Sequence, residues 1–308
     1  MPRRERPPQI HTLTGNLLWE QTLEFRDWAP GRTQRAASVH FQVGGKGINV
    51  SRMLNRLGSA NTALCFPGGL SGSACTTWLK ESKITFRAFP AAGATRVGTV
   101  VRGGSRPETT FLGPDVSPGK AALRACAAYL DGRPDGDILA ISGSLPGWDT
   151  SDFDPLRAAL ERWARRATLV ADTYGAPLAW LVERPVELVK INRDEFDAFS
   201  AGWGAGGRLA ARLRDARHRF RARSWVVTDG GGPVAFIDGS DAAGRVVPPA
   251  VREVSPTGSG DVLLACILHA RTRLGLALGD AVAYAAPFAA ANAADPGIAE
   301  FPWPPPGK

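Results

Sequence analysis

Apolar stretches rich in β-branched residues alternate with amphipathic stretches along most of this chain. The apolar stretches have the length and composition of β-strands, and we predict strands at 63–66, 137–142, 167–172, 186–191, 224–228 and 234–237. The amphipathic stretches predict helices at 48–57, 119–130, 151–166, 208–214, 260–274 and 278–294. Strands separated by helices of this length indicate an α/β fold with a mostly parallel sheet. Ligands of such sheets bind outside the carboxyl ends of the strands.

Two segments interrupt this alternation. Residues 13–43 and 96–112 contain short alternating stretches but no long helical one. TRVGTVVRGG (95–104) has the pattern of a hairpin, so we predict that the two segments form a small β layer over one edge of the sheet. The ends, 1–9 and 302–308, are predicted to be disordered tails. We therefore expect residues 1–308 to form a single domain that carries this small β layer.

Composition and charge exclude several classes of function. The chain has 308 residues, enough for one large α/β domain, and a formal net charge of +8. Its arginines are scattered and no nucleic-acid-binding motif accompanies them, so we expect a solvated basic surface and no nucleic-acid partner. The four cysteines form no CxxC pair, which favours free thiols in a reducing cytoplasm. We see no secretory signal and no apolar run of transmembrane length, and we expect a cytoplasmic protein without a membrane partner.

The segment SPTGSGD (255–261) precedes a strongly apolar stretch, VLLACILHA. A Gly-x-Gly turn that opens a helix exposes backbone N–H groups at the positive end of the helix dipole, and a backbone without Cβ atoms can approach a phosphate closely. Asp261, in the first turn of this helix, could accept a hydroxyl proton during phosphoryl transfer. A plain glycine-rich turn with Asp261 as a helix cap explains the same residues.

Two further segments carry candidate chemistry. In GGKGINV (44–50), glycines precede a predicted helix, and Lys46 and Asn49 could hold a ligand with hydroxyl or phosphate groups; the segment is not a Walker A loop, and a flexible turn with a surface lysine is the alternative. In KINRDE (190–195), Asn192 and Glu195 are three residues apart and could share a helix face. A carboxylate near a phosphate site commonly holds Mg²⁺ through water, but an ordinary capped helix start also explains this segment.

Taken together and in this order, GGKGINVSR (44–52) and SPTGSGD (255–261) resemble the PfkB carbohydrate kinases of the ribokinase-like superfamily. ISGSLPG (141–147), Thr95-Arg96 and KINRDE resemble further segments of that family. The GGKGIN form is most similar to the branch with 1-phosphofructokinase, tagatose-6-phosphate kinase and the minor 6-phosphofructokinase. The resemblance covers about residues 10–300 and implies a three-layer α/β/α fold with a mostly parallel central sheet, in which the small β layer is a lid.

This resemblance implies an ATP- and Mg²⁺-dependent kinase that phosphorylates a hydroxyl of a sugar phosphate, with Asp261 as the base. It implies an anion hole for the transferred phosphoryl group at Gly258, Ser259 and Gly260. It implies substrate contacts at Asn16, Glu20, Arg35, Gly44, Gly45, Lys46, Asn49, Arg96 and Ser144. It implies nucleotide contacts at Asn192, Glu195, Thr228, Gly230 and Asn292, with Glu195 also holding Mg²⁺ through water. Arg35, Arg96 and Ser144 match positions near the substrate phosphate, and pairing of the lid in a homodimer is a further implication.

The chain departs from the family pattern at its sugar-binding end. Glu20 takes the place of the usual aspartate, and the bulky Trp19 precedes it. Ile191 replaces a proline, and DGGGP (229–233) replaces the usual loop after the nucleotide strand. Two alternatives therefore stay open: a kinase for nucleosides or unphosphorylated sugars, for which Arg35 and Arg96 are dispensable, and a non-catalytic ligand sensor on the same fold.

Overall fold

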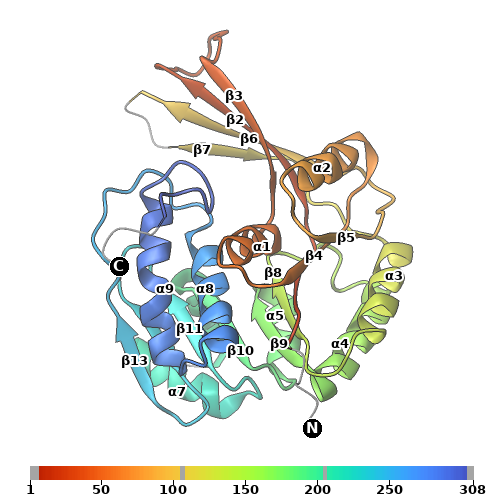
Figure 1. Ribbon diagram of the computed structural model, residues 1–308, viewed down its shortest axis with the longest axis vertical. Coiled ribbons are helices and arrows are strands. Elements are labelled where there is room, and N and C mark those ends of the chain that lie inside the picture. The colour runs from red at the N-terminus through yellow and green to blue at the C-terminus, as the bar shows by residue number, and fades with distance from the viewer. Residues whose placement is uncertain (1–6, 105–107, 204–206, 304–308) are drawn as a thin grey trace.

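A computed structural model describes residues 7–104, 108–203 and 207–303. The centre of the fold is a nine-stranded sheet in the order β13-β12-β11-β10-β9-β8-β1-β4-β5 (Figure 1). The strands from β11 to β5 in this order are parallel, whereas β12 and β13 run antiparallel at one edge. The bounds are β1 Ile10–Thr14, β4 Asn61–Cys65, β5 Phe86–Ala88, β8 Ile138–Ser142, β9 Thr168–Asp172, β10 Leu188–Asn192, β11 Trp225–Thr228, β12 Val234–Ile237 and β13 Ala243–Val246.

Helices cover both faces of this sheet, which makes three layers. Alternate residues of one strand join different cores: Leu139 and Ile141 of β8 join one cluster, and Ile138 and Ala140 join the other. The first cluster includes α3 Lys120–Asp131, α4 Asp154–Arg166, α5 Gly175–Val182, α6 Arg193–Ser200 and α7 Leu209–Arg219. The second includes α1 Lys46–Arg56, α8 Ser259–Arg273 and α9 Leu278–Ala293. Burial on both faces explains why the parallel strands are almost continuously apolar.

A smaller four-stranded sheet projects from one end of the main body (Figure 1). Its order is β3-β2-β6-β7, with bounds β2 Leu18–Phe25, β3 Ser38–Gly44, β6 Arg96–Gly103 and β7 Thr109–Leu112. The helix α2 Gly69–Glu81 packs beside β2 and β3, through Cys75 and Leu79. Short 3₁₀ turns, η1 Ser151–Phe153 and η2 Ala201–Trp203, complete the elements.

Cross-strand pairing gives this small sheet two different faces, because residues opposite each other point to the same side. On the inner face, Glu20, Thr22 and Val100 are only 7%, 6% and 4% exposed. On the outer face, Phe41 and Phe111 are 48% and 58% exposed. The central strands β2 and β6 are therefore buried on the inner face, although Leu112 at its β7 edge is 55% exposed, whereas the outer face is apolar and open.

The other predicted strands and helices are present, with shifted ends, but the hairpin predicted for 95–104 is wrong, because Arg96–Gly103 is the single strand β6, which pairs with β7 and β2. The sequence pattern also missed β1, β5, β13, α2, α5 and α6. The prediction for 13–43 was wrong at its start, because β1 is a fully buried central strand of the large sheet and the small sheet begins at Leu18. Polar residues hid this strand: His11 is paired with Asp137 (3.2 Å) and the Thr12 hydroxyl contacts Ser51 (2.8 Å). These partners make their burial acceptable.

The two predicted tails lie mostly outside the described residues. The exception at the N-terminus is Gln9, whose backbone N–H donates to the Asp137 carboxylate at 3.0 Å. At the C-terminus, the ring of Trp303 lies 5.4 Å from that of Phe288. Both ends of the described chain are thus attached to the main body. None of the described helices has the length and apolar character needed to span a membrane.

Candidate active site

The candidate residues meet at the carboxyl edge of the large sheet. Asp172, Asn192 and Thr228 are the last residues of the neighbouring strands β9, β10 and β11. The helices α1 and α8 both begin at this edge, each after a glycine with positive φ: Gly45 (130°) and Gly258 (80°). A positive φ is open to glycine at little cost, so these two positions set where the helices start.

The two glycine-rich segments, far apart in the sequence, come together through their helices. The side-chain N–H of Asn49 donates to Oδ2 of Asp261 at 2.8 Å, across 212 positions. Both residues are 5% exposed. The carboxylate of Asp261 therefore lies in a protected site beside the glycine-flanked lysine segment, as the sequence interpretation requires.

Four charged groups beside Asp261 form a compact cluster. The Lys46 ammonium lies 3.1 Å from Oδ1 of Asp172 and 3.3 Å from the Glu195 carboxylate. The Lys190 ammonium lies 3.0 Å from Oδ2 of Asp172. Asp172 is fully buried, which is tolerable because two ammonium groups pair with it. The sequence analysis gave Asp172 and Lys190 no role. A usable signal was present, because Asp172 ends the buried strand β9 and Lys190 lies within the neighbouring buried strand β10.

This cluster sets the protonation of its members. Burial, together with the negative charge of Asp172, raises the pKa of Asp261 to about 6, although Lys190, Lys46 and Asn49 oppose the shift. Burial alone would raise the pKa of Asp172, but the charges of Lys190 and Lys46 outweigh burial and lower it. Burial would lower the pKa of Lys46, but the surrounding carboxylates, Asp172 foremost, raise it instead. Near neutral pH, Asp261 is ionised and more basic than an ordinary aspartate.

The turn before Asp261 offers fewer free amides than predicted. The Ser259 N–H donates to the carbonyl of Pro256 at 3.2 Å, so this amide is used within the turn. Within the described parts of the chain, the N–H groups of Gly258 and Gly260 have no backbone acceptor. Gly260 also lies against Lys190: a Cβ at this position would be 2.6 Å from the lysine Nζ. Two amides without a backbone acceptor and an ammonium group thus lie at the start of α8.

Asn292 does not take the position expected for a nucleotide contact. It is 0% exposed, and its Nδ2 donates to the carbonyl of Thr257 (3.0 Å) and to the Ser259 hydroxyl (3.1 Å). Its Oδ1 accepts from the N–H of Ala299 at 2.8 Å. Because both donors and the acceptor are engaged inside the fold, the structure places Asn292 as a support for the glycine-rich turn.

Asn16, Ser144 and Arg96 meet around a carboxylate that the sequence analysis did not single out. Nδ2 of Asn16 lies 2.7 Å from Oδ1 of Asp115 and 2.9 Å from the Ser144 hydroxyl. The Arg96 guanidinium donates to the same Asp115 oxygen at 2.8 Å. Arg35 is not part of this group, because it is exposed in the loop between β2 and β3. Arg96 and Asn16 therefore hold one carboxylate, with Ser144 bonded to Asn16, and Arg35 stands apart from this group.

Glu20 and the lid strands form a separate polar network on the inner face of the small sheet. The Glu20 carboxylate accepts from Gln42 at 2.5 Å, and Gln42 in turn accepts from Arg52 at 3.0 Å. Burial raises the pKa of Glu20, while the bond from Gln42 opposes this shift. Trp19, which precedes Glu20, points to the outer face and stacks on Phe41 with ring centroids 5.5 Å apart. Trp19 therefore does not crowd the carboxylate.

The small sheet also reaches the glycine-rich turn. Arg102 of β6 pairs with Glu108 at 2.5 Å and lies 3.4 Å from the Ser255 hydroxyl. The Thr257 hydroxyl donates to Glu108 at 3.3 Å. These contacts hold the small sheet over the segment that precedes Asp261, which is the position of a closed lid.

The segment after β10 is a well-formed helix start. Asn192 caps α6: its Oδ1 accepts from the Glu195 N–H at 2.8 Å, and the Glu195 carboxylate accepts from the Asn192 N–H at 3.0 Å. A capped helix start, one of the two interpretations of this segment in the sequence analysis, is thus confirmed. The Glu195 carboxylate also pairs with the Lys46 ammonium. Thr228 ends the adjacent strand β11, and Gly230 follows in the turn with φ of 52°. Across the described residues, no three His, Cys, Asp or Glu side chains form a metal-binding group.

A basic carboxylate, two amides without a backbone acceptor and two lysines lie together near one edge of the large sheet, below the small one. Donors and charges of these kinds are suited to phosphoryl transfer. Comparison with known proteins agrees. Residues 16–304 match the family model described as pfkB family carbohydrate kinase. The chain belongs to this family, and it is a carbohydrate kinase, a phosphotransferase with an alcohol group as acceptor.

Individual relatives are consistent with this membership. The 1-phosphofructokinase of Xanthomonas campestris is 33% identical over 83% of this chain and 82% of the relative. The ATP-dependent 6-phosphofructokinase isozyme 2 of Mycobacterium tuberculosis is 29% identical over 94% of this chain and 88% of the relative. Phosphofructokinase-2 from Escherichia coli in complex with fructose-6-phosphate has the same fold, with a TM-score of 0.84, 23% identity and coverage of 93% of this chain and 94% of that one. These comparisons do not favour the nucleoside-kinase or sensor alternatives.

Proposed function

We propose that this enzyme transfers the γ-phosphoryl group of ATP to a hydroxyl of a sugar phosphate, with Asp261 as the general base. One observation carries the proposal: at the start of α8, Asp261 is hydrogen-bonded to Asn49 and lies close enough to Lys46 for the lysine charge to lower its pKa. The names of the relatives, 1-phosphofructokinase and 6-phosphofructokinase, support a phosphorylated sugar as the acceptor.

In this mechanism Asp261 takes the proton of the acceptor hydroxyl. Asn49 holds one carboxylate oxygen, Oδ2, so the other is free to face the substrate. Oδ1 of Asn49 is buried and has no hydrogen-bond partner among the described residues, so it can accept from a second sugar hydroxyl. The free amides of Gly258 and Gly260 stabilise the charge that develops on the transferred group, which is an electrostatic contribution. The lid keeps water from the reaction.

The described residues offer Mg²⁺ one carboxylate, that of Glu195, and no group of three ligands. The ion prefers oxygen ligands, keeps several waters and takes one or two carboxylates together with substrate phosphates. Glu195 offers such a carboxylate at the edge of the charge cluster, and we propose that it holds Mg²⁺ through water. When bound, the ion would neutralise phosphate charge. Thr228 and Gly230, on the neighbouring strand end and turn, would line the nucleotide site.

The substrate phosphate would bind to Arg96 and Asn16, with Ser144 beside Asn16, by displacing the Asp115 carboxylate that Arg96 and Asn16 now hold. We expect wild-type enzyme to prefer fructose 1-phosphate, fructose 6-phosphate or tagatose 6-phosphate over ribose and adenosine in an assay of coupled ADP release.

Arg96→Ala should raise KM for the preferred sugar phosphate about tenfold or more, because a charge-assisted bond to phosphate is lost. Asp115→Asn should lower that KM, because the competing charge is removed.

Three outcomes of this assay would count against the proposal. Faster turnover of ribose or adenosine would contradict the phosphorylated acceptor. A KM that is insensitive to Arg96→Ala would remove Arg96 from the phosphate site. A rise in KM for Asp115→Asn would show that Asp115 contacts the sugar directly and does not compete with its phosphate. The exposed Arg124→Ala variant, on α3 and outside the small sheet, is a matched control that should leave all values unchanged.

We also propose that the outer face of the lid pairs with a second copy of this chain. This face carries Val39, Phe41, Val97 and Phe111, which are 46–58% exposed, and a contiguous apolar surface of this kind marks an interaction site. Phosphofructokinase-2 from Escherichia coli has been described in a tetrameric form.

Phe41→Glu should therefore convert a dimer to a monomer in sedimentation-velocity experiments. Val247→Glu, at a position that is 72% exposed outside the lid, is the control and should leave the dimer intact. A monomeric wild-type protein, or a dimer that tolerates Phe41→Glu, would contradict pairing through this face.

A further inference from the structure

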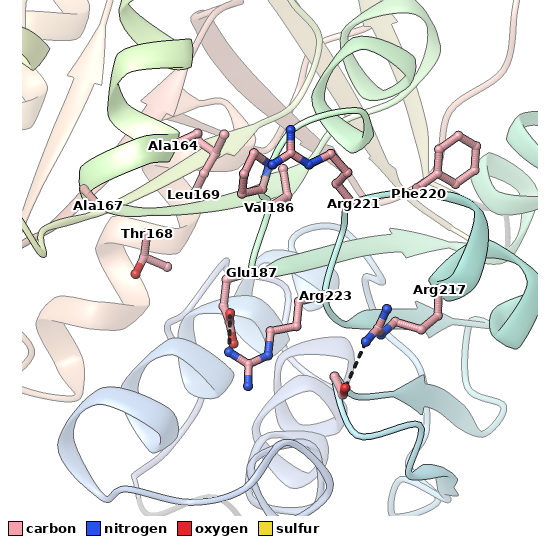
Figure 2. A pocket seen from close by; sticks show the side chains of 12 residues that line it. Ala164, Ala167, Thr168, Leu169, Val186, Glu187, Arg217, Phe220, Arg221 and Arg223 are labelled. Atoms are coloured by element: carbon pink, nitrogen blue, oxygen red, sulfur yellow. Dashed lines mark hydrogen bonds and ion pairs between the residues drawn. The ribbon is translucent and has the colours of Figure 1, made fainter.

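A second concavity of about 610 Å³ lies at the opposite edge of the large sheet from Asp261 (Figure 2). Thr168 begins β9, Glu187 directly precedes β10, and Arg223 lies just before β11, whereas the active site is at the far ends of these strands. We call this space the amino-edge pocket. It is lined by residues of α4, α7, the strand starts and the turn after β12, and it is separate from the site of phosphoryl transfer.

The amino-edge pocket has an excess of positive charge. Arg217, Arg221 and Arg223 line it, and in Figure 2 the Arg217 guanidinium is directed to an oxygen acceptor, that of Arg223 to Glu187, and that of Arg221 lies beside Val186. Among the described residues that line the pocket, Glu187 alone is acidic. Its carboxylate is already paired with Arg271, at 3.0 Å, and lies 3.7 Å from Arg223. One carboxylate shared in this way does not balance the three arginines of the pocket.

Several guanidinium donors in this pocket are open to a ligand. Arg217 is half-buried and donates from one terminal nitrogen to the carbonyl of Gly239 at 2.9 Å, so it contributes mainly its positive charge. Arg221 is exposed, and in the described parts of the chain its side chain makes no hydrogen bond or ion pair. Arg223 is 67% exposed at its side chain. By contrast, Arg162 on the same face of the sheet is bound to Asp131 through two nitrogens.

Apolar side chains complete the lining. Ala164 and Ala167 are half-buried and Pro185 is exposed, so these three present the apolar part of the lining, whereas Leu169 and Val186 are only 1% exposed. Arginine pairs with the oxygens of a phosphate group through parallel N–H bonds, and three arginines match a group that carries two negative charges. We infer that the amino-edge pocket binds an organic phosphate monoester, with its phosphate on the arginines and an apolar or planar group on Ala164 and Pro185.

Isothermal titration calorimetry with phenyl phosphate tests this inference on the full-length protein. We expect a dissociation constant in the micromolar to millimolar range, with weaker binding of inorganic phosphate. Arg221→Glu should weaken binding of phenyl phosphate by about tenfold or more, because it removes one charge-assisted bond and adds a repelling charge. Arg221 is exposed and without side-chain partners, so the variant should fold. Arg124→Glu, on an exposed position of α3, is the matched control.

The outcomes are decisive in both directions. Weaker binding in Arg221→Glu but not in Arg124→Glu supports the pocket. Absence of binding, or binding that Arg221→Glu leaves unchanged, would overturn it. Inorganic phosphate that binds as tightly as phenyl phosphate would show that the apolar surface plays no part, and the organic ligand class would be wrong. Because phenyl phosphate could also enter the active site, each titration is repeated with ATP and sugar phosphate present in Asp261→Asn.

Discussion

Asp261→Asn is expected to lower kcat by about 10²–10⁴-fold, the usual contribution of a positioned general base. The amide cannot take the proton of the acceptor hydroxyl at neutral pH. It can still accept the hydrogen bond that Asn49 donates to the carboxylate at 2.8 Å, so the geometry of the site should persist. Steady-state turnover and ATP affinity, measured on the same preparation, separate loss of chemistry from loss of binding.

The control for this variant is Asp280→Asn, on an exposed position of α9, which should retain full activity. Near-normal turnover of Asp261→Asn would remove Asp261 as the base. Loss of ATP binding together with turnover would instead indicate that the variant had disturbed the anion site.

The pH dependence of the wild-type enzyme gives a second test of Asp261. Its pKa is raised to about 6, so kcat/KM should fall as the pH drops through that value and the base becomes protonated. The same shift has a thermodynamic sign: a carboxyl whose pKa is higher in the folded state stabilises the fold below its unfolded pKa and loses that contribution as the pH rises through about 6.

Wild-type protein therefore carries an ionised, buried carboxylate near neutral pH that Asp261→Asn lacks. We expect the variant to be more stable there, by up to about 3 kcal/mol from a shift of roughly two pKa units, and the difference should disappear in acid. Thermal unfolding of both proteins across this pH range measures the effect. A variant less stable than wild type at neutral pH would contradict the raised pKa.

Gly260→Ala is expected to lower kcat by about 10²–10³-fold, as for loss of one oxyanion-type donor. An added Cβ would lie 2.6 Å from the Lys190 ammonium, which is buried and paired with Asp172. Either the lysine leaves this position or the first turn of α8 shifts, and the second change moves Asp261, the next residue. Because Nζ is the end of a flexible side chain, the fold should survive with a small loss of stability.

Gly202→Ala is the matched control, since no atom lies within 4 Å of the Cβ that this change adds. It should leave kcat and the melting temperature close to wild type. If Gly260→Ala keeps full turnover, close approach of the backbone at this point is not needed for phosphoryl transfer. If it unfolds the protein, the contact with Lys190 matters to stability more than we expect.

The local chemistry of the site was predictable from the sequence. The glycines at 45 and 258 mark helix starts whose backbone conformation favours glycine, and Asp261 follows at a position where a carboxylate faces the exposed amides. Alternating strands and helices predicted the layered fold, because each strand is buried on both faces. The family resemblance added the role of the small sheet as a lid. Along its strands, successive residues alternate between the inner and the outer face, as in an ordinary β-sheet.

The tertiary structure decided which distant residues become neighbours. The order of parallel strands depends on long-range pairing, so only the folded chain puts Asp172 and Lys190 beside Asp261 and Lys46. Burial of Asp261 within that cluster, which no single segment of the sequence determines, raises the pKa of its carboxylate. The same pairing places Arg217, Arg221 and Arg223 around one pocket at the opposite edge. The sequence by itself determined which groups can do chemistry, and the tertiary structure determined which of them act on one another.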